Sequence, residues 1–314
     1  MTDKATYFDE NYNTSWISPS IATKITSFLV KYDFSVLDAK QLRDFMIKFI
    51  EKEKDSAVIV FSMDKAPDTV LDHNDANSLI RQFLDAGGRI VWIGDIPFWH
   101  IGKALNWLAI EKNQKKAELY YQTTAHMAVL GVNPVIRTAS AGTVKITRKG
   151  KNFGLRYTWS GARPIDVSKK LGFRFWWQNI TSTIINDNSI PISFNLGYIP
   201  KDERIIILAK SQYLTARPVI LLKKRSRFRV GSAKISLPPK VDVALDNVEE
   251  EEAGPYDREF WKTYANAWFK NFNRSKPMSG FIRIWDYVPR VMTDNMLEDL
   301  LRISLYGSDD FKED

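Results

Sequence analysis

Acidic side chains and one histidine follow three predicted strands at their carboxyl ends. In doubly wound sheets, ligands bind outside these strand ends. Carboxylates there can bind a divalent cation, or act as acid and base when their pKa values differ. We therefore take Asp95 and His100 as candidate catalytic residues. The candidate ligand-binding residues are Asp9, Glu10, Asp64 (beside Lys65) and Trp99.

The segment 94–102 (GDIPFWHIG) has the most unusual composition in the chain. Pro97 disfavours a helix directly after the strand. Trp99 could stack on a ligand, and His100 could donate or accept a proton. Two alternatives remain open. The aromatic side chains of this segment insert into the core, or the acids simply cap helices and turns, which is their commonest role at such positions.

Several chemistries are excluded by residues that the chain lacks. It has no cysteine, so thiolate nucleophiles, disulfides, Cys-ligated zinc and iron–sulfur clusters are ruled out. No H-E-x-x-H, Walker A, G-x-G-x-x-G or G-x-S-x-G motif occurs. We expect no metal site and no cofactor, with a divalent cation at the carboxylates as the alternative.

The first 100 residues alternate between short apolar strands and amphipathic helices. Ser18 before Pro19 resembles a helix N-cap, and Asp38 with Gln41 a capping box. This alternation predicts an α/β fold with a doubly wound, mainly parallel sheet and helices on both faces. The strands are predicted at 4–8, 34–37, 57–63 and 89–95.

The middle of the chain changes character. We expect an antiparallel, β-rich insertion at 136–256, with a mobile acidic loop near 246–254, between an α/β core at 1–135 and a closing part at 257–314. The competing interpretation is a separate C-terminal α+β domain. The further elements predicted are a hairpin at 142–159 that turns at 149–152, strands at 205–209, 218–223 and 281–287, an aromatic helix at 259–272, and a last helix across 297–305.

The charge balance leaves a polyanion partner open. The chain has 45 Lys and Arg against 37 Asp and Glu, a net charge of +8. The densest basic run, KKRSRFR at 223–229, continues to Lys240, and Phe228 within it suits base stacking. Two other roles of this basic run compete with anion binding. It can form a solvated strand edge, or it can pair with the acidic residues at 249–252. The candidate nucleic-acid or anion contacts are Lys223, Lys224, Arg225, Arg227 and Arg229.

The chain has no run of about 18 apolar residues, so we expect no membrane contact. Its start at 1–10 is polar and acidic, which predicts no secretory signal and a cytoplasmic location.

Residues 1–95 resemble the flavodoxin-like core of the class I glutamine amidotransferase superfamily, including its ThuA-like branch. The resemblance is carried by AVIVFSMD at 57–64, by LIRQFLDAGGRIVWIGD at 79–95, and by the closing FIRIWDY and LLRISLYG segments. It implies a flavodoxin-like fold. Catalytic members use a cysteine paired with a histidine, so the absence of cysteine excludes that glutaminase chemistry here.

We therefore expect a non-catalytic, glutamine amidotransferase-like binding or assembly module. We expect its partner to be another protein or a second copy of the chain, bound through aromatic surfaces at 173–177 or 259–272. Alternatively, the module binds a small ligand at the strand ends. Core packing is the commoner role of such aromatic stripes. One alternative is a hydrolase without a cysteine nucleophile, using Asp95 and His100. Another is a nucleic-acid-associated protein that acts through 223–240.

Overall fold

The computed structural model describes fourteen stretches of the chain, and every structural statement below concerns these. They are residues 2–12, 17–52, 56–73, 77–103, 118–121, 125–132, 142–161, 164–167, 205–211, 229–230, 233–234, 264–276, 279–286 and 291–307. The strand predicted at 218–223, the acidic loop near 246–254, the aromatic cluster at 173–177 and the basic run up to Phe228 lie outside them.

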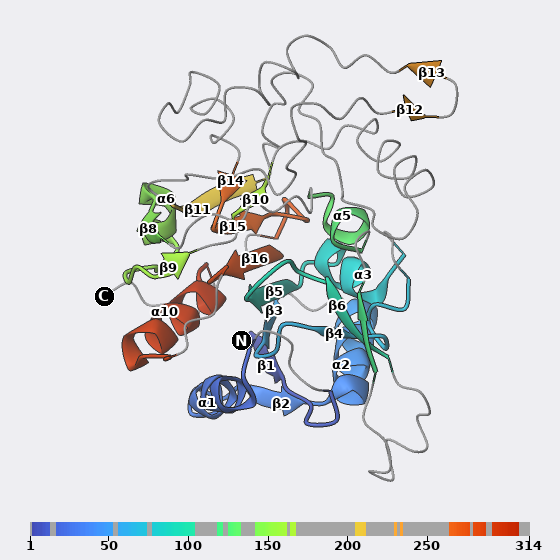
Figure 1. Ribbon diagram of the computed structural model, residues 1–314. Helices are drawn as coiled ribbons and strands as arrows, with labels where there is room; N and C mark the ends of the chain where they lie inside the picture. The colour runs from blue at the N-terminus through green and yellow to red at the C-terminus, as the bar shows by residue number, and fades with distance from the viewer. Residues whose placement is uncertain are drawn as a thin grey trace.

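One nine-stranded mixed sheet forms the centre of the protein, in the order β2-β1-β3-β5-β16-β15-β11-β8-β9 (Figure 1). Its first five strands are parallel, and each later neighbour is antiparallel. The predicted α/β class with a mainly parallel sheet is confirmed. The strands are β1 (Asp3–Tyr7), β2 (Ser35–Leu37), β3 (Ala57–Phe61), β5 (Arg89–Ile93), β8 (Gly142–Ile146), β9 (Ser160–Gly161), β11 (Ile205–Ser211), β15 (Ala267–Lys270) and β16 (Gly280–Ile284).

Helices lie on both sides of the parallel strands. In Figure 1, α1 and α10 lie to one side, and α2 and α3 to the other. The expected caps are present: the Ser18 hydroxyl accepts a hydrogen bond from the Ile21 amide, and Asp38 and Gln41 form a capping box. The helices are α1 (Pro19–Val30), α2 (Ala39–Glu51), α3 (Leu79–Asp85), α5 (Ala125–Leu130), α6 (Arg148–Asn152) and α10 (Asp294–Leu305). None of the described helices is both long and apolar enough to cross a bilayer, and the cytoplasmic location stays a prediction.

The core is densest around β3, β5 and β16, where every residue is buried. Parallel strands covered on both faces are continuously apolar, as the run AVIVF in β3 indicates. The ring of Trp92 lies 5.2 Å from that of Phe61 and 5.1 Å from that of Phe98, measured between centroids. The Trp92 ring also lies 6.5 Å from that of Phe281 on β16, so strands far apart in the sequence share one aromatic core.

A smaller three-stranded sheet follows the carboxyl ends of β3 and β5. It consists of β4 (Ala66–Pro67), β6 (His100–Lys103) and β7 (Glu118–Tyr121), in the order β4-β6-β7. Two further pairs join β10 (Ile165–Asp166) with β14 (Tyr264–Ala265), and β12 (Arg229–Val230) with β13 (Ala233–Lys234).

The prediction of an aromatic helix at 259–272 is wrong for its described part. Tyr264 and Ala265 form β14, and β15 pairs with β16 on one side and β11 on the other. All four residues of β15 are buried. Aromatic residues favour strands as well as core helices, and pairing on both sides decides the outcome here.

For the hairpin predicted at 142–159, the position of the turn is wrong. Residues 149–152 lie in α6, where the hydroxyl of Thr147 accepts a hydrogen bond of 3.0 Å from the Gly150 amide. The strand that returns to β8 is the short β9. A Cβ at Gly150 would lie 2.1 Å from the carbonyl oxygen of Leu208 in β11, so this helix packs directly on the sheet backbone.

Candidate functional site

Four aspartates follow the four central parallel strands at the same edge of the sheet. They are Asp9, Asp64, Asp95 and Asp286, two or three residues beyond β1, β3, β5 and β16. Phe61 is paired with Trp92, and Ile93 with Ile284. If the register is continued past the strand ends, Asp64 stands opposite Asp95, and Asp95 opposite Asp286. The structure thus brings the predicted acids to one edge.

Asp286 is a member of this row that the sequence analysis missed. It lies within FIRIWDY, which was treated as one strand, whereas β16 ends at Ile284. The rule applied to the first 100 residues, an acid directly after an apolar run, would have found it.

The carboxylate of Asp9 accepts hydrogen bonds from two backbone amides. One carboxylate oxygen accepts a hydrogen bond of 2.9 Å from the Asn11 amide, and the other accepts one of 3.1 Å from the Ala39 amide at the start of α2. Its carboxylate therefore has the structural role of the alternative interpretation, and its ligand-binding role stays a prediction. Glu10 is exposed beside it.

Two buried tyrosines, Tyr7 and Tyr12, close the end of β1. Burial and the nearby carboxylates of Asp9 and Asp68 raise the pKa of both phenols, so both stay protonated. A Cβ at Gly102 would lie 2.0 Å from Cδ1 of Tyr12, so the Tyr12 ring rests on the backbone of β6. The small sheet therefore packs over this strand end.

The segment 94–102 contributes the fully buried Phe98 to the core and its last three residues to β6 of the small sheet. Phe98 is fully buried, and its ring centroid lies 5.6 Å from that of Phe281. Trp99 is half-buried, and His100 begins β6 rather than ending a loop. Insertion into the core, one of the two alternatives, therefore holds for Phe98.

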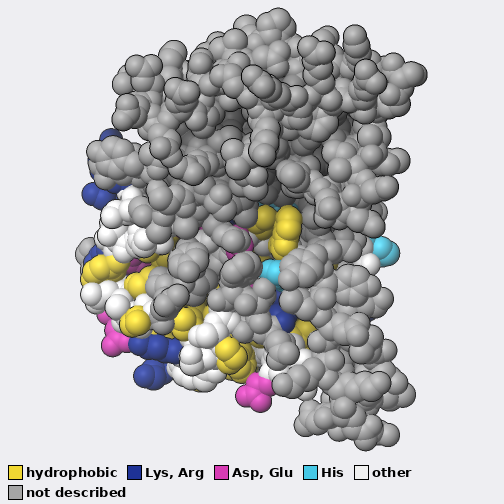
Figure 2. Space-filling model, viewed as in Figure 1, with side chains coloured by type: hydrophobic (Ala, Val, Ile, Leu, Met, Phe, Trp, Pro, Cys, Tyr) yellow, Lys and Arg dark blue, Asp and Glu magenta, His cyan; other side chains and the backbone are white. Residues whose placement is uncertain are grey.

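Lys65 lies next to Asp64, directly after β3, and only 2% of it is exposed. Burial lowers the pKa of its ammonium group to about 8, and Asp64 partly opposes this change. Ala66 is paired with Ile101, so in the continued register Lys65 stands beside His100. Figure 2 shows a histidine side chain near the centre of the viewed face and a Lys or Arg side chain below it.

The start of the 94–102 segment is held by β16. The Nε of Arg283 donates hydrogen bonds of 3.2 and 3.0 Å to the carbonyl oxygens of Gly94 and Asp95. Next to it, the carboxylate of Asp286 accepts hydrogen bonds from Trp159 Nε1 at 2.9 Å and from Asn266 Nδ2 at 2.7 Å. These contacts position the backbone that carries Asp95.

The helix α5 supports the same segment from the other side. His126 on this helix is fully buried, and its Nδ1 lies 3.1 Å from the carbonyl oxygen of Pro97. Burial, together with the charges of Arg283 and Lys270, lowers its pKa from 6.5 to about 3. His126 is therefore neutral at physiological pH.

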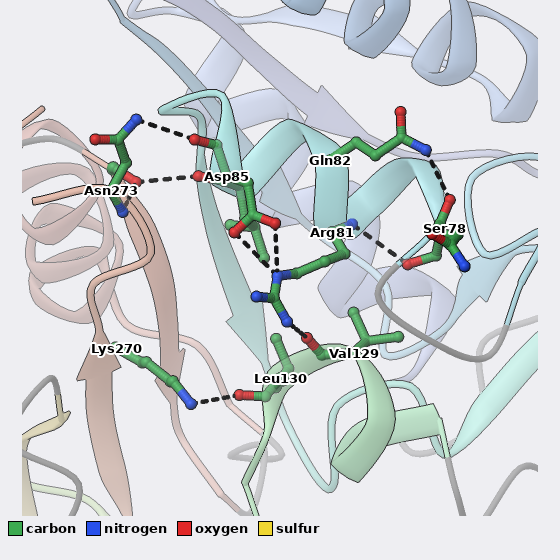
Figure 3. Close-up of polar contacts among 11 residues, drawn as sticks. Ser78, Arg81, Gln82, Asp85, Val129, Leu130, Lys270 and Asn273 are labelled. Atoms are coloured by element: carbon green, nitrogen blue, oxygen red, sulfur yellow. Dashed lines mark hydrogen bonds and ion pairs between the residues drawn. The ribbon is translucent and has the colours of Figure 1, made fainter.

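Two cations anchor the carboxyl end of α5 to the core, as Figure 3 shows. Arg81 of α3 donates a hydrogen bond of 3.1 Å to the Val129 carbonyl, and Lys270 of β15 donates one of 2.7 Å to the Leu130 carbonyl. Arg81 is held in turn by Asp85, because the Nε of Arg81 donates to both carboxylate oxygens, at 3.0 and 2.9 Å. Cations at a helix carboxyl terminus also stabilise it through the helix dipole.

Within the described stretches, no three His, Asp or Glu side chains converge as a metal site. Of the five candidate anion contacts, only Arg229 falls within these stretches, in β12. Hydrolysis by Asp95 and His100, and nucleic-acid binding by the basic run, stay predictions.

Comparison with known proteins relates the chain to one group of sequences. The profile of the MJECL34 family matches residues 2–198. An uncharacterized protein, MJECL34 of Methanocaldococcus jannaschii, is 37% identical over 161 residues, which cover 50% of this chain and 50% of that protein. The match thus spans about half the length of the relative. No solved structure matches the chain.

Proposed function

The chain belongs to the MJECL34 family, and we propose that it is a non-catalytic binding module that holds a small polar ligand at the carboxyl edge of its parallel strands. One observation carries this proposal. Along the two neighbouring connections, β3 to β4 and β5 to β6, four ionisable side chains are each at most 7% exposed: Asp64, Lys65, Asp95 and His100.

Four ionisable side chains are thus concentrated in the interior, at two neighbouring strand ends. Strongly buried ionisable groups that gather in one place are characteristic of functional sites. Their position also fits the general rule that open parallel sheets bind ligands outside the carboxyl ends of their strands.

The strand order supports a flavodoxin-like sheet as part of this proposal. The five parallel strands lie in the order β2-β1-β3-β5-β16, which in chain order corresponds to the 2-1-3-4-5 arrangement of flavodoxin-like folds. In that arrangement β2 is added on one side of β1 and the later strands on the other, so the strand order reverses between β1 and β3, beside Asp9 and Lys65. The proposed kinship with glutamine amidotransferase-like proteins rests on this order and on the sequence segments above, with a binding role because no cysteine is present.

A thermal-shift screen of the full chain tests the binding role. The panel contains sugars, nucleosides, amino acids and small carbonyl compounds. A ligand at 100 times its Kd stabilises a protein by about 2.7 kcal/mol. We expect a compound that raises the Tm of the wild type and fails to raise the Tm of the isosteric variant Asp95→Asn.

Asp44→Asn is the matched control, because Asp44 is an exposed acid on α2, far along the chain from the strand ends. Its Tm shift with the same compound should equal that of the wild type. A shift of equal size in Asp95→Asn would place the ligand elsewhere, and a panel without any stabilising compound would count against a binding function.

A further inference from the structure

We propose that Lys65 is a reactive amine that binds a small aldehyde or ketone reversibly as an imine. This inference rests on the binding function proposed above and names the class of ligand for the same site. It starts from a comparison of Lys65 with the other buried cations of the protein.

The other buried cations of the described residues have carbonyl acceptors. Lys270 donates to Leu130 at 2.7 Å, and Arg283 to Gly94 and Asp95 at 3.2 and 3.0 Å. Arg89 donates to the carbonyl oxygens of Ser304 and Tyr306. No hydrogen bond or ion pair is found for the Lys65 ammonium group among the described residues, although only 2% of the residue is exposed.

Burial of this residue favours the neutral amine over the charged ammonium form. Lysine is the basic side chain whose pKa falls readily on burial, and catalytic and Schiff-base lysines arise in this way. Burial lowers the pKa of Lys65 from 10.5 to about 8. The neutral amine is the nucleophile, and lowering the pKa by desolvation is a recognised means of activating it.

The surroundings favour an uncharged carbonyl compound over an anion. Asp64 adjoins Lys65 in the chain, and Asp95 stands at the neighbouring strand end in the continued register. Two carboxylates so placed repel a phosphate or carboxylate ligand. His100 lies beside Lys65 when the register of β4 and β6 is continued by one residue.

The covalent step needs no further reactant. The lone pair of Lys65 Nζ forms a bond to the carbonyl carbon, and one proton moves from this nitrogen to the carbonyl oxygen to give a carbinolamine. The remaining N–H proton is then transferred to this hydroxyl, the C–O bond breaks, and the oxygen leaves as water. The nitrogen and carbon are then joined by the C=N bond of the imine, and addition of water reverses the reaction.

Reductive trapping tests the inference. The full chain is incubated at pH 7 with propanal and cyanoborohydride, and the alkylated lysines are mapped by peptide mass spectrometry. A fall in pKa from 10.5 to about 8 raises the neutral fraction at pH 7 roughly 300-fold. Because a less basic amine is also a weaker nucleophile, we expect Lys65 to be labelled at least about 10-fold faster than the exposed Lys149 and Lys151.

Two features separate a binding site from general reactivity. The rate at Lys65 should saturate with propanal concentration, whereas the rates at Lys149 and Lys151 should rise linearly. Lys65→Met should remove the fast label, and the matched variant Lys151→Met should retain it at Lys65. If Lys65→Met does not fold, the wild-type peptide map alone decides the question.

Slower labelling of Lys65 than of Lys149 and Lys151, or a rate at Lys65 that does not saturate, would overturn the inference. The proposed binding function is tested separately from this result, because its test is the loss of a ligand-induced Tm shift in Asp95→Asn. A ligand that requires Asp95 while Lys65 stays unlabelled would leave the binding function standing and refute the imine alone.

Discussion

Acidification should destabilise this protein through His126 before most carboxylates are protonated. The imidazole of His126 is fully buried on α5, with Nδ1 at 3.1 Å from the Pro97 carbonyl and the ring edge-on to Trp268. Two cations, Arg283 and Lys270, oppose a further positive charge there, and with burial they lower its pKa from 6.5 to about 3.

The sign and size of the effect follow from proton linkage. In the unfolded chain His126 takes up a proton near pH 6.5, whereas the folded protein resists protonation until about pH 3. Stability is therefore intact above pH 6.5 and falls continuously down to about pH 3. At 1.36 kcal/mol per pH unit, the loss attributable to His126 reaches about 2 kcal/mol at pH 5.

Urea denaturation at pH 7.5 and at pH 5 measures this loss. His126→Gln keeps a polar side chain of similar size and has no charge at either pH. Between the two pH values, we expect the wild type to lose about 2 kcal/mol more of its unfolding free energy than this variant. His73→Gln is the matched control, because His73 is exposed and the variant should behave as the wild type.

An equal loss of stability in the wild type and in His126→Gln would refute the reasoning. His100 is buried as well, but it is present in both proteins, so its contribution cancels in the comparison. The variant need not be as stable as the wild type. If its unfolding free energy changes less between the two pH values than that of the wild type, the prediction is supported, because only this difference reports the titration of His126.

Two further predictions concern stability at the candidate site. Lys65→Met should stabilise the protein at pH 7 and have little effect near pH 10.5, because the cost of burying the ammonium group is complete below about pH 8 and vanishes as the unfolded chain also loses its proton. Thermal melts at the two pH values measure this, and a pH-independent gain would contradict it. Gly161→Ala should destabilise by about 1–3 kcal/mol, because its Cβ would lie 2.6 Å from Asn266 Nδ2 and 2.8 Å from Asp286 Oδ1. Urea denaturation should show this loss, the exposed Ser160→Ala should show none, and equal stability of the two variants would contradict the close packing.

Much of the fold was predictable because its signals are local. The capping box of Asp38 and Gln41 and the Ser18 cap need only neighbouring residues. The apolar run of β3 identifies a strand covered on both faces without knowledge of what covers it. The acids after these strands were found for the same reason, since their place follows from the strand ends.

The polar contacts within the site were not predictable, because they join segments far apart in the chain. Arg283 reaches the carbonyl oxygens of Gly94 and Asp95 across 189 and 188 positions. His126 owes its low pKa first to burial, and then to the charges of Arg283 and Lys270, which lie on two distant strands. No local pattern distinguishes such residues from ordinary strand positions.

The amino-acid sequence by itself determined the α/β alternation, the helix caps and the absence of thiol chemistry, because propensity, capping and composition act over a few residues. Only the tertiary structure decided that 264–270 forms strands, since pairing with β11 and β16 outweighs the local aromatic spacing. It also decided that Lys65 is buried, with only 2% of the residue exposed. Burial and electrostatic environment depend on which distant segments pack together, and a single stretch of sequence does not contain that information.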